Sequence, residues 1–364
     1  MKNKVKCSIV VANYNNGRFL EQLIESVLNQ THANWELIIT DDASTDNSIS
    51  IINRFLYDKR IKLIELTKNQ GAANAFKTSI ENSSGNIIAM LGADDALKKN
   101  AIELIVQQHN RYPNAAMIIA NLICCDENLQ PTGKYIKFFE IDETDSYINY
   151  FGISGWDTFK RTFYDKTEGI DIDLKRAVDQ DLYLKMEEFG ELKHFDENLY
   201  LYRTNPKGIS QQNNQSFAHE YNYLAIIKAY KRRKKTGFKN LSKKKYKNVL
   251  VNYEYLRIIN DYKKGKFYKA DIEIKETFKS LLENKKLNNI QEFIIFFSFL
   301  DTISNSYNIF FIKKKLLTSF FIKKKYNSYT LKALFYPKIK AYKYLSYYET
   351  IKITVKSILN WQAK

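Results

Sequence analysis

Cysteine, proline and glycine are scarce in this chain, which has three cysteines, four prolines and 12 glycines among 364 residues. The cysteines show no Cys-x-x-Cys spacing, and the adjacent pair Cys124 and Cys125 can form a disulfide only through a strained ring. We therefore expect reduced thiols at these two residues and at Cys7, as in a cytosolic protein. The histidines show no spacing typical of metal ligands, and they are His32, His109, His194 and His219.

Glycine-rich phosphate-binding motifs are also absent from the sequence. No Gly-x-Gly-x-x-Gly follows the first expected strand, and no Walker-type Gly-Lys-Ser/Thr occurs. These absences argue against a dinucleotide-dependent oxidoreductase and against a P-loop nucleoside triphosphatase.

Long apolar runs are missing as well. The longest strongly apolar run, residues 293–300, is far shorter than the roughly 20 residues that a membrane-spanning helix needs. The apolar run near the N-terminus, residues 7–12, is too short for the core of a signal peptide. We therefore expect a cytoplasmic protein, and peripheral contact with the inner face of the cell membrane stays open.

Acidic residues are few in the second part of the chain. Up to Glu220 there are 24 Lys and Arg against 31 Asp and Glu, whereas the remainder has 33 against 9, so the net charges are −7 and +24. The length exceeds that of one ordinary domain. We predict a catalytic domain at 1–220 and a basic, aromatic-rich, mainly helical region at 221–364. Such a basic region favours an anionic membrane surface or nucleic acid, or it is a solvated face.

Short apolar runs alternate with helical periodicity over the first 120 residues. Runs such as Ser8–Val11 suit buried strands, and apolar residues at helical spacing follow them. This alternation, with short polar loops, predicts a parallel α/β sheet flanked by helices. The expected strands are 8–11, 35–40, 61–66, 87–91 and 116–120, and the expected helices lie near 19–30, 49–56, 75–80 and 98–112.

Pairs of carboxylates follow two of these strands. Asp41 and Asp42 end the second expected strand, and Asp94 and Asp95 end the fourth. Open α/β sheets bind ligands at the carboxyl ends of their strands. Two carboxylates there suit a hard divalent cation, which in turn attracts a diphosphate. An Asp-Asp pair can instead begin a turn or cap the helix expected near Lys98.

Further short motifs occur in a fixed order along the chain. They are the segments 8–15, 26–31, 41–46, 69–71, 93–95, 168–171, 179–184 and 202–205. In this order and spacing the chain resembles the family 2 inverting glycosyltransferases over roughly residues 5–212. The resemblance implies the GT-A type nucleotide-diphospho-sugar transferase fold, with a central, mostly parallel sheet flanked by helices. It also implies a metal-dependent site and inversion at the transferred sugar carbon.

The resemblance implies a nucleotide site at the ends of the first strands. It assigns nucleobase contacts to Ala12, Tyr14, Asn15 and Asp42, and a carboxylate at Asp42 can accept a hydrogen bond from uracil N3–H. Asn69 is expected to assist this nucleotide-binding loop.

Asp94 and Asp95 are the implied metal-binding residues, with Mn²⁺ or Mg²⁺ as the cofactor. Asp94 maps to a ribose or metal contact, and Asp95 maps to the ligand that meets the diphosphate, so Asp95 is the first choice. The commonest family pattern is Asp-Ala-Asp-Asp, but Gly92 stands at its first position, and some members also lack that acid. Asp41 and Asp46 equally suit turn and helix-cap roles.

The residues downstream of 150 are implied to serve the acceptor and the phosphates. In an inverting transfer one general base takes the proton of the acceptor hydroxyl, and Asp179 falls at the position of that base. Trp156 can stack on a sugar ring or belong to the core, and Asp181 lies on another helical face from Asp179. Arg203 suits phosphate recognition, whereas Asn205 replaces the usual histidine of the family.

The basic region interleaves lysines with aromatic residues. The hexapeptide at 310–315 recurs at 320–325, and dense basic runs lie at 231–235 and 243–245. A ten-residue offset falls about 80° short of whole helical turns, so the two copies would not share one face of a straight helix. Interleaved aromatics and lysines suit a segment at a membrane interface. A helical appendage packed on the catalytic domain is the alternative.

Together these features predict a metal-dependent inverting glycosyltransferase. The expected donor is a nucleotide-diphospho-sugar, with a UDP-sugar favoured. The expected acceptor is a hydroxyl of a glycan or a lipid-linked acceptor in cell-surface polysaccharide synthesis. Two alternatives are an inactive transferase scaffold with a polyanion-binding tail, and a nucleotidyltransferase. Nucleic acid is not expected as a partner, because the sheet pattern shows no base-stacking platform.

Overall fold

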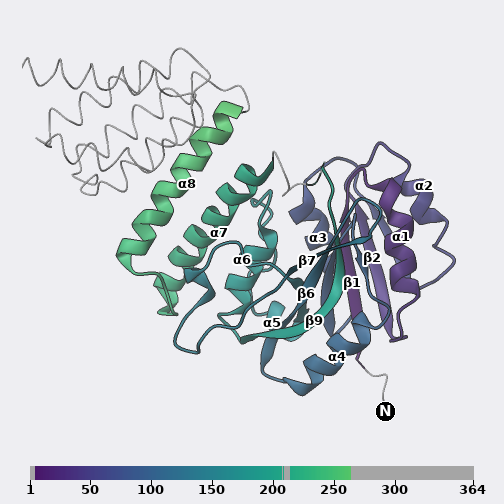
Figure 1. Cartoon of the computed structure of the whole chain (residues 1–364), viewed down its shortest axis with the longest axis horizontal. Helices are drawn as coiled ribbons and strands as arrows, with labels where there is room; N and C mark the ends of the chain where they lie inside the picture. The colour runs from purple at the N-terminus through teal and green to yellow at the C-terminus, as the bar shows by residue number, and fades with distance from the viewer. Residues whose placement is uncertain (1–4, 207, 209–213, 264–364) are drawn as a thin grey trace, which may run out of the picture. The chain divides into compact units, whose positions relative to one another are not determined.

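Strands that alternate with helices form the first part of the sheet, as the sequence pattern predicts (Figure 1). The computed structural model describes residues 5–206, 208 and 214–263. Parallel strands pair in the order β3-β2-β1-β4. These strands are β1 (Cys7–Asn13), β2 (Trp35–Asp41), β3 (Ile61–Glu65) and β4 (Ile87–Gly92), and the helices between them are α1 (Gly17–Leu28), α2 (Ser48–Asn53) and α3 (Ala72–Glu81).

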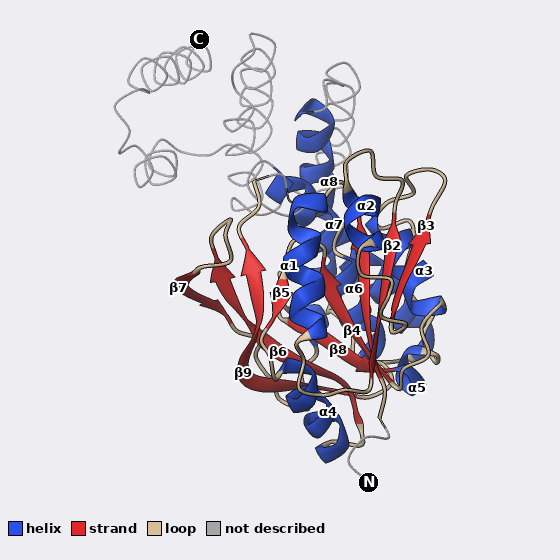
Figure 2. Cartoon of the chain, turned by 90° about the vertical axis from the view of Figure 1, so that its right-hand side faces the viewer, coloured by secondary structure: helices blue, strands red, loops and turns tan. Residues whose placement is uncertain are grey.

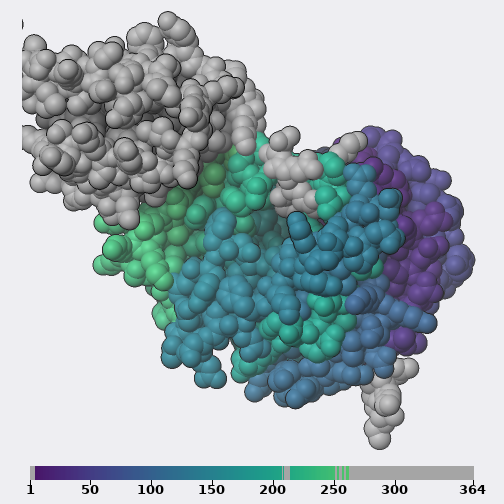
Figure 3. Space-filling model, in the orientation of Figure 1, coloured from purple at the N-terminus to yellow at the C-terminus, as the bar shows by residue number. Residues whose placement is uncertain are grey.

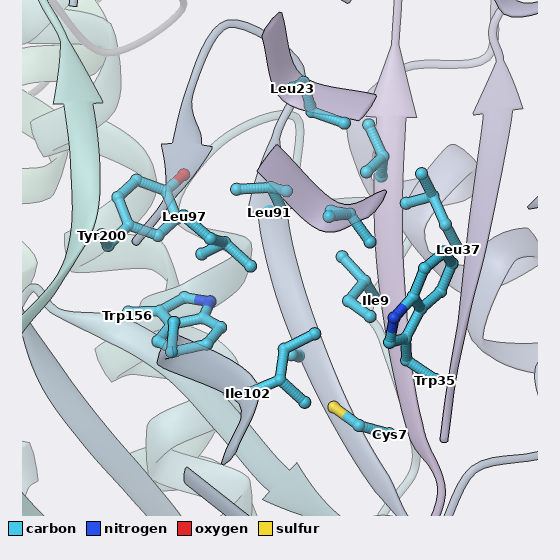
Figure 4. Packing of buried hydrophobic residues seen from close by; sticks show 14 of the residues in the cluster. Cys7, Ile9, Leu23, Trp35, Leu37, Leu91, Leu97, Ile102, Trp156 and Tyr200 are labelled. Atoms are coloured by element: carbon cyan, nitrogen blue, oxygen red, sulfur yellow. The ribbon is translucent and has the colours of Figure 1, made fainter. Parts of the chain in front are cut away.

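Both faces of β1, β2 and β4 are buried, which explains their nearly continuous apolar sequence, whereas β3 at the edge exposes Lys62 and Glu65. Alternate residues of β1 enter different cores, since Ile9 packs in one cluster with α1 and Val10 packs in another with α3. Figure 4 shows the first cluster, in which Ile9 and Leu37 of the sheet face Leu23 of α1. Figure 2 shows α1 in front of the parallel strands.

The second part of the sheet is mixed, because antiparallel strands are added there to the predicted parallel ones. Strand β8 (Trp156–Lys160) lies between β4 and β6 (Ala115–Cys125) and is antiparallel to both, while β9 (Glu191–Arg203) is parallel to β6. Strand β5 (Ala96–Leu97) pairs with β9, and β7 (Pro131–Ile136) pairs with β6. The remaining elements up to residue 200 are α4 (Ala101–Arg111), η1 (Tyr147–Asn149), α5 (Arg161–Tyr164) and α6 (Val178–Met186).

Helices α7 (Gln215–Thr236) and α8 (Lys243–Lys263) follow the sheet and pack on each other, and α7 packs on α6 (Figure 1). The domain boundary expected at residue 220 therefore falls inside α7. Every described residue belongs to one compact unit within residues 1–266, and the two predicted domains stay a prediction. The repeats at 310–325 lie outside the described residues.

Part of the basic run at 231–235 is used inside the protein. The Arg233 side chain is fully buried, and its guanidinium binds Glu187 and Glu188 at the end of α6, both at 2.8 Å. It also donates to the Leu184 carbonyl and to the Ser146 hydroxyl. This arginine therefore fastens α7 to α6 rather than facing a solvent or membrane surface. In the described part of the chain, no helix has both the length and the apolarity to cross a membrane.

Candidate active site

The tips of three neighbouring strands meet at one edge of the sheet. In the register, Asn13 of β1 lies opposite Asp41 of β2, and Ala12 lies opposite Gly92 of β4. The loop after β1, the acids after β2 and the acids after β4 are therefore adjacent, as expected for parallel strands. Tyr14, in the first of these loops, is 45% exposed and so leaves its ring open to a ligand.

Asp42, expected to contact the nucleobase, is buried and organises a loop. Its Oδ1 accepts from the Gln70 backbone N–H and its Oδ2 from the Gly71 N–H, both at 2.7 Å. Asp42 thus holds the segment in which Asn69, an exposed residue, lies beside the site. The base contact of Asp42 stays a prediction, and its shown role is to position this segment.

The loops after β1 and β2 are bonded to each other through Asn15. Its Oδ1 accepts from the Thr45 N–H at 2.8 Å, and its own N–H donates to the Ser44 hydroxyl at 2.9 Å. Asn15 has a φ of 54°, and Ala43 has a φ of 61°. Positive φ at non-glycine residues is uncommon and gathers at functional sites. Asn15 therefore joins the loop after β1 to the loop after β2, the two loops that the sequence predicts to contact the nucleotide.

Asp41 and Asp46 have the turn and cap roles that the sequence left open. Asp41 accepts from the backbone and side chain of Ser44. Asp46 accepts from the backbone of Ser48, in the first turn of α2, and from the Gly17 N–H that begins α1. Both carboxylates thus accept hydrogen bonds from N–H and O–H groups of the loops that follow β1 and β2.

Gly71 offers a test of how strongly this loop supports donor binding. Its φ of 91° and ψ of 159° suit glycine alone, and a Cβ there would meet no atom within 4 Å. We expect Gly71→Ala to lower the free energy of unfolding by about 1–2 kcal/mol through backbone strain and to raise the KM for the donor. Urea unfolding and donor titration of the initial rate measure the two effects.

Gly133→Ala is the matched control, because Gly133 also has a positive φ (77°) and equally open surroundings, in the hairpin of β6 and β7. It should show a similar loss of stability with an unchanged KM. A donor KM that rises equally in both variants would contradict a specific role for the loop at Gly71.

Asp95, the first choice as metal ligand, is buried, and both of its carboxylate oxygens accept hydrogen bonds from other residues. It is 3% exposed. Its Oδ2 accepts from the Tyr200 hydroxyl at 2.5 Å, and its Oδ1 accepts from the Arg203 backbone N–H at 2.7 Å. The Tyr200 hydroxyl in turn accepts from the Gly92 N–H at 2.9 Å. Burial and the neighbouring charge of Asp94 raise the pKa of Asp95 well above its ordinary value. The structure therefore favours Asp95 as an anchor of the turn that joins β4 to β5.

Asp94 is the more accessible member of the pair. Its side chain is half-buried, and its Oδ2 accepts from the Asn205 amide at 2.7 Å. Asn205, at the position of the usual family histidine, therefore supports Asp94. The pair caps no helix, because α4 begins later, after Asn100. The turn alternative holds in part, since the Asp95 N–H donates to the Gly92 carbonyl.

Arg203 does not have the open geometry expected of a phosphate ligand. It is 1% exposed, and its guanidinium donates to the Asp94 carbonyl, to the Glu127 carbonyl and to Oε1 of Gln22. The guanidinium also lies 4.3 Å from the centre of the Phe19 ring. Phosphate contact stays a prediction for Arg203, whose role in the structure is to position the Asp94 backbone.

The donor set near Asp94 fits a divalent cation that is shared with a substrate. Among the residues that the structure describes, no three His, Cys, Asp or Glu side chains are grouped closely enough to hold an ion by themselves. Mg²⁺ commonly binds through one or two carboxylates together with substrate phosphates. A half-buried aspartate at a strand tip supplies the protein share of such a site, and Asp94 is the residue that fits it.

Asp179 lies in the first turn of α6 and is half-buried. The residue that begins the helix, Ala177, has a φ of 56°, a further strained non-glycine position. Burial raises the pKa of the Asp179 carboxyl above its ordinary value. A carboxylate with a raised pKa suits a general base near neutral pH.

Two residues that sequence reasoning missed, Asp157 and Tyr183, connect Asp179 to the sheet. Tyr183 lies one helical turn after Asp179, and its hydroxyl donates to Asp157 of β8. Burial and the charge of Asp179 raise the pKa of Asp157 well above its ordinary value. Because β8 runs antiparallel beside β4, the start of β8 lies near the end of β4. Asp179 therefore stands at the same edge of the sheet as Asp94.

Trp156 and Asp181, the two weaker acceptor-side candidates, are both interior residues. Trp156 is 1% exposed, packs beside Tyr200 (Figure 4), and its Nε1 donates to the Met90 carbonyl at 3.0 Å. Asp181 is buried and pairs with Lys185 at 2.7 Å, and Lys185 also donates to the Gly169 carbonyl. Of the roles that the sequence left open for Trp156, its burial favours the core role, and Asp181 belongs to a buried ion pair.

Trp156 can therefore be changed with an effect on stability rather than on acceptor use. In Trp156→Phe the buried Met90 carbonyl loses its partner, so we expect the free energy of unfolding to fall by about 1–2 kcal/mol. The KM for the acceptor should stay within twofold of the original. Denaturant unfolding and acceptor titration measure these effects, and a large rise in acceptor KM at unchanged stability would restore the stacking role.

The parallel strand tips, the turn that carries Asp94 and the acid on α6 define a nucleotide-diphospho-sugar transferase fold of the GT-A type. Residues 8–167 match the family model described as "Glycosyl transferase family 2". This segment, which is less than half of the chain, is similar to the family 2 glycosyltransferases, in agreement with the predicted family, fold class and enzyme class.

Relatives match only in part. The chondroitin synthase of Pasteurella multocida (strain Pm70) is 28% identical over 205 residues, which cover 53% of this chain and 20% of that protein. The glycosyltransferase GlyG of Streptococcus pneumoniae serotype 4 is 37% identical over 122 residues, or 33% of this chain and 40% of that one. The chain thus matches less than half the length of either relative.

A solved structure supports the fold. S. aureus TarS 1-349, determined in complex with UDP-GlcNAc, superposes with a TM-score of 0.54 over 82% of this chain and 80% of that chain. The sequence identity is 15%. At 15% sequence identity this similarity supports a shared fold.

Proposed function

We propose that this chain transfers a sugar from a nucleotide-diphospho-sugar to an acceptor hydroxyl with inversion at the anomeric carbon. The observation that carries the proposal is the placement of Asp179 at the sheet edge where Asp94 lies in the turn after β4. A single displacement requires a general base for the acceptor proton and, at the same edge, a carboxylate that can hold a cation against the leaving diphosphate.

In this reaction the acceptor oxygen forms a bond to the anomeric carbon while the bond from that carbon to the diphosphate oxygen breaks. The Asp179 carboxylate takes the acceptor proton, and the electron pair of the broken bond leaves on the nucleoside diphosphate. A Mn²⁺ or Mg²⁺ ion, when bound, neutralises charge on the diphosphate. Asp94 is the residue proposed to hold that ion, with Asp95, Tyr200 and Arg203 fixing its position.

A UDP-sugar is the proposed donor. The exposed Tyr14 ring and the loop held by Asp42 provide a surface for a nucleobase, and the TarS structure of similar fold contains UDP-GlcNAc. The names of several partial relatives refer to polymers, namely chondroitin synthase, hyaluronan synthase and a putative teichuronic acid biosynthesis enzyme. We therefore propose a glycan or lipid-linked acceptor in cell-surface polysaccharide synthesis, at the inner face of the membrane.

Release of UDP from a panel of UDP-sugars, with and without Mn²⁺ or Mg²⁺, tests the proposal. The expected result is metal-dependent UDP release with at least one donor and its loss in Asp94→Asn. Thr67→Ala, at an exposed residue just after β3, is the control. Pyrophosphate as the product would identify a nucleotidyltransferase instead. Absence of release with every donor, in a protein that binds none of them, would favour an inactive scaffold.

A further inference from the structure

A hollow of about 200 Å³ opens between the catalytic sheet unit and its two appended helices, away from the residues assigned to transfer. One wall comes from η1 and the loop after it, and the other comes from α7 and α8. The lining residues are Ile148, Asn149, Tyr150, Phe151, Tyr223, Ile226, Leu241, Lys245, Asn248 and Val249. Figure 3 shows the green residues of α8 beside the blue residues of this loop region.

Aromatic rings form one side of this hollow. Phe151 is 40% exposed, and its ring centre lies 4.6 Å from that of Tyr223 and 5.2 Å from that of His219. The exposed Phe151 ring and the half-buried Tyr223 ring in a concave setting give an apolar platform for a flat or ring-shaped ligand. The size of the hollow suits one sugar ring rather than a folded peptide.

Polar groups stand opposite the rings. Lys245, Asn248 and Val249 share one face of α8, and the Lys245 ammonium donates to Oδ1 of Asn149 at 3.0 Å. The Asn248 amide and the other N–H groups of the Lys245 ammonium are of the kind that bind hydroxyl and carboxylate groups. The nearest carboxylate on this loop, Asp145, is occupied by the Tyr150 hydroxyl and the Asn149 amide.

Lys245 is the one lysine among the residues that line the hollow. Lys243, Lys244 and Lys247 are exposed on the same two turns of α8 but do not line it. Lys245 also acts on Asp145 of the opposite wall, where the Tyr150 hydroxyl and then the charge of Lys245 help to lower the pKa of that carboxyl. Arg232 and Arg233 of α7, in contrast, bind Glu188 inside the protein. Lys245 is thus the positive group that the lining offers to an external anion.

We propose that this hollow binds one ring of an acidic polysaccharide, with Phe151 and Tyr223 stacking on the sugar and Lys245 pairing with its carboxylate or phosphate. The inference rests on the proposed function, since it gives a sugar-transferring enzyme a second contact with a growing chain. A membrane surface would meet protruding apolar groups rather than a concave platform. Aromatic rings beside Lys245 and Asn248 suit a ring that has both a flat apolar face and polar substituents better than an aliphatic chain.

Binding of a size-defined oligogalacturonate to the full-length chain, measured by calorimetry without any donor, tests the proposal. We expect the double variant Phe151→Ala and Lys245→Ala to bind at least tenfold more weakly than the original protein. The matched control is Phe189→Ala with Lys59→Ala, because both residues are exposed and lie away from the hollow. Thermal unfolding confirms that each variant is folded.

Maltoheptaose, a neutral oligosaccharide, should bind at least tenfold more weakly than the acidic one. Equal binding of the oligogalacturonate by the double variant and the control would overturn the proposal. The proposal would also be overturned if single-stranded DNA or phosphatidylglycerol vesicles bound the protein more tightly than the oligogalacturonate does, and if that binding were lost in the same double variant at Phe151 and Lys245. Because no donor is present, this result is independent of whether the chain releases UDP.

Discussion

Asp179→Asn should lower kcat for sugar transfer by about 10²–10⁴-fold, the usual contribution of a general base. An asparagine keeps the shape of the side chain but cannot take the acceptor proton. Donor binding should stay close to that of the original protein, because Asp179 lies on α6 rather than on the nucleotide-side loops. Single-turnover transfer and donor titration separate the two quantities.

The pH dependence of the original enzyme gives a second measurement of the same group. Burial raises the pKa of Asp179, and only the deprotonated form is active as a base. Activity should therefore rise with pH, with a midpoint above the ordinary aspartate pKa of about 3.9. This rise should be absent from the residual activity of Asp179→Asn. Asp173→Asn, at an exposed neighbour, is the control. A variant at 179 with undiminished kcat would remove Asp179 from the mechanism.

The parallel half of the fold was predictable because its strands are buried on both faces. Ser8–Val11 and Ile87–Leu91 are apolar at nearly every position, and only a strand covered on both sides keeps such a sequence. The acids after them were predictable for a related reason, since parallel strands bring their carboxyl ends together.

Strand β8 escaped prediction because tertiary contacts, not its own pattern, make it a strand. Its residues Asp157 and Thr158 are polar but buried. Asp157 accepts from Tyr183 of α6, and Thr158 donates to the Ile118 carbonyl of β6 while its hydroxyl also meets His109. None of these partners lies within 20 residues, so local sequence gives no sign of how the polar groups are satisfied.

The site residues show the same division between residue type and residue role. The sequence indicates that Asp42 and Asp95 belong near the site because they follow expected strands, and the family resemblance places Arg203 there as well. Their roles depend on whether their polar atoms are already occupied. Backbone N–H groups take both oxygens of Asp42, and carbonyls receive the Arg203 guanidinium. Such contacts join segments more than 25 residues apart, and only the folded chain reveals them.

Gly92→Asp should inactivate the protein, although it restores the commonest acid of the family pattern. A Cβ at Gly92 would lie 2.5 Å from Oδ2 of Asp95 and 3.0 Å from the Tyr200 hydroxyl. Asp95 cannot move away easily, because Tyr200 and the Arg203 backbone hold both of its oxygens. Overpacking of this kind costs about 1–3 kcal/mol. The displaced turn would carry Asp94 with it, and a misplacement of about 1 Å can lower activity on the order of 100-fold.

Thermal unfolding and metal-dependent UDP release measure both effects, and Asn128→Asp, which adds one negative charge at an exposed turn, is the control. Gly92→Ala should retain the steric part of the loss, because the clash begins at Cβ. The difference between the two variants then isolates the repulsion between the new carboxylate and Asp95. If Gly92→Asp is as stable and as active as the original protein, Tyr200 and Asp95 do not fix the turn. If Gly92→Asp loses stability and activity as expected, the Tyr200 hydroxyl of β9 occupies the space that the aspartate side chain of the commonest family pattern would take at position 92.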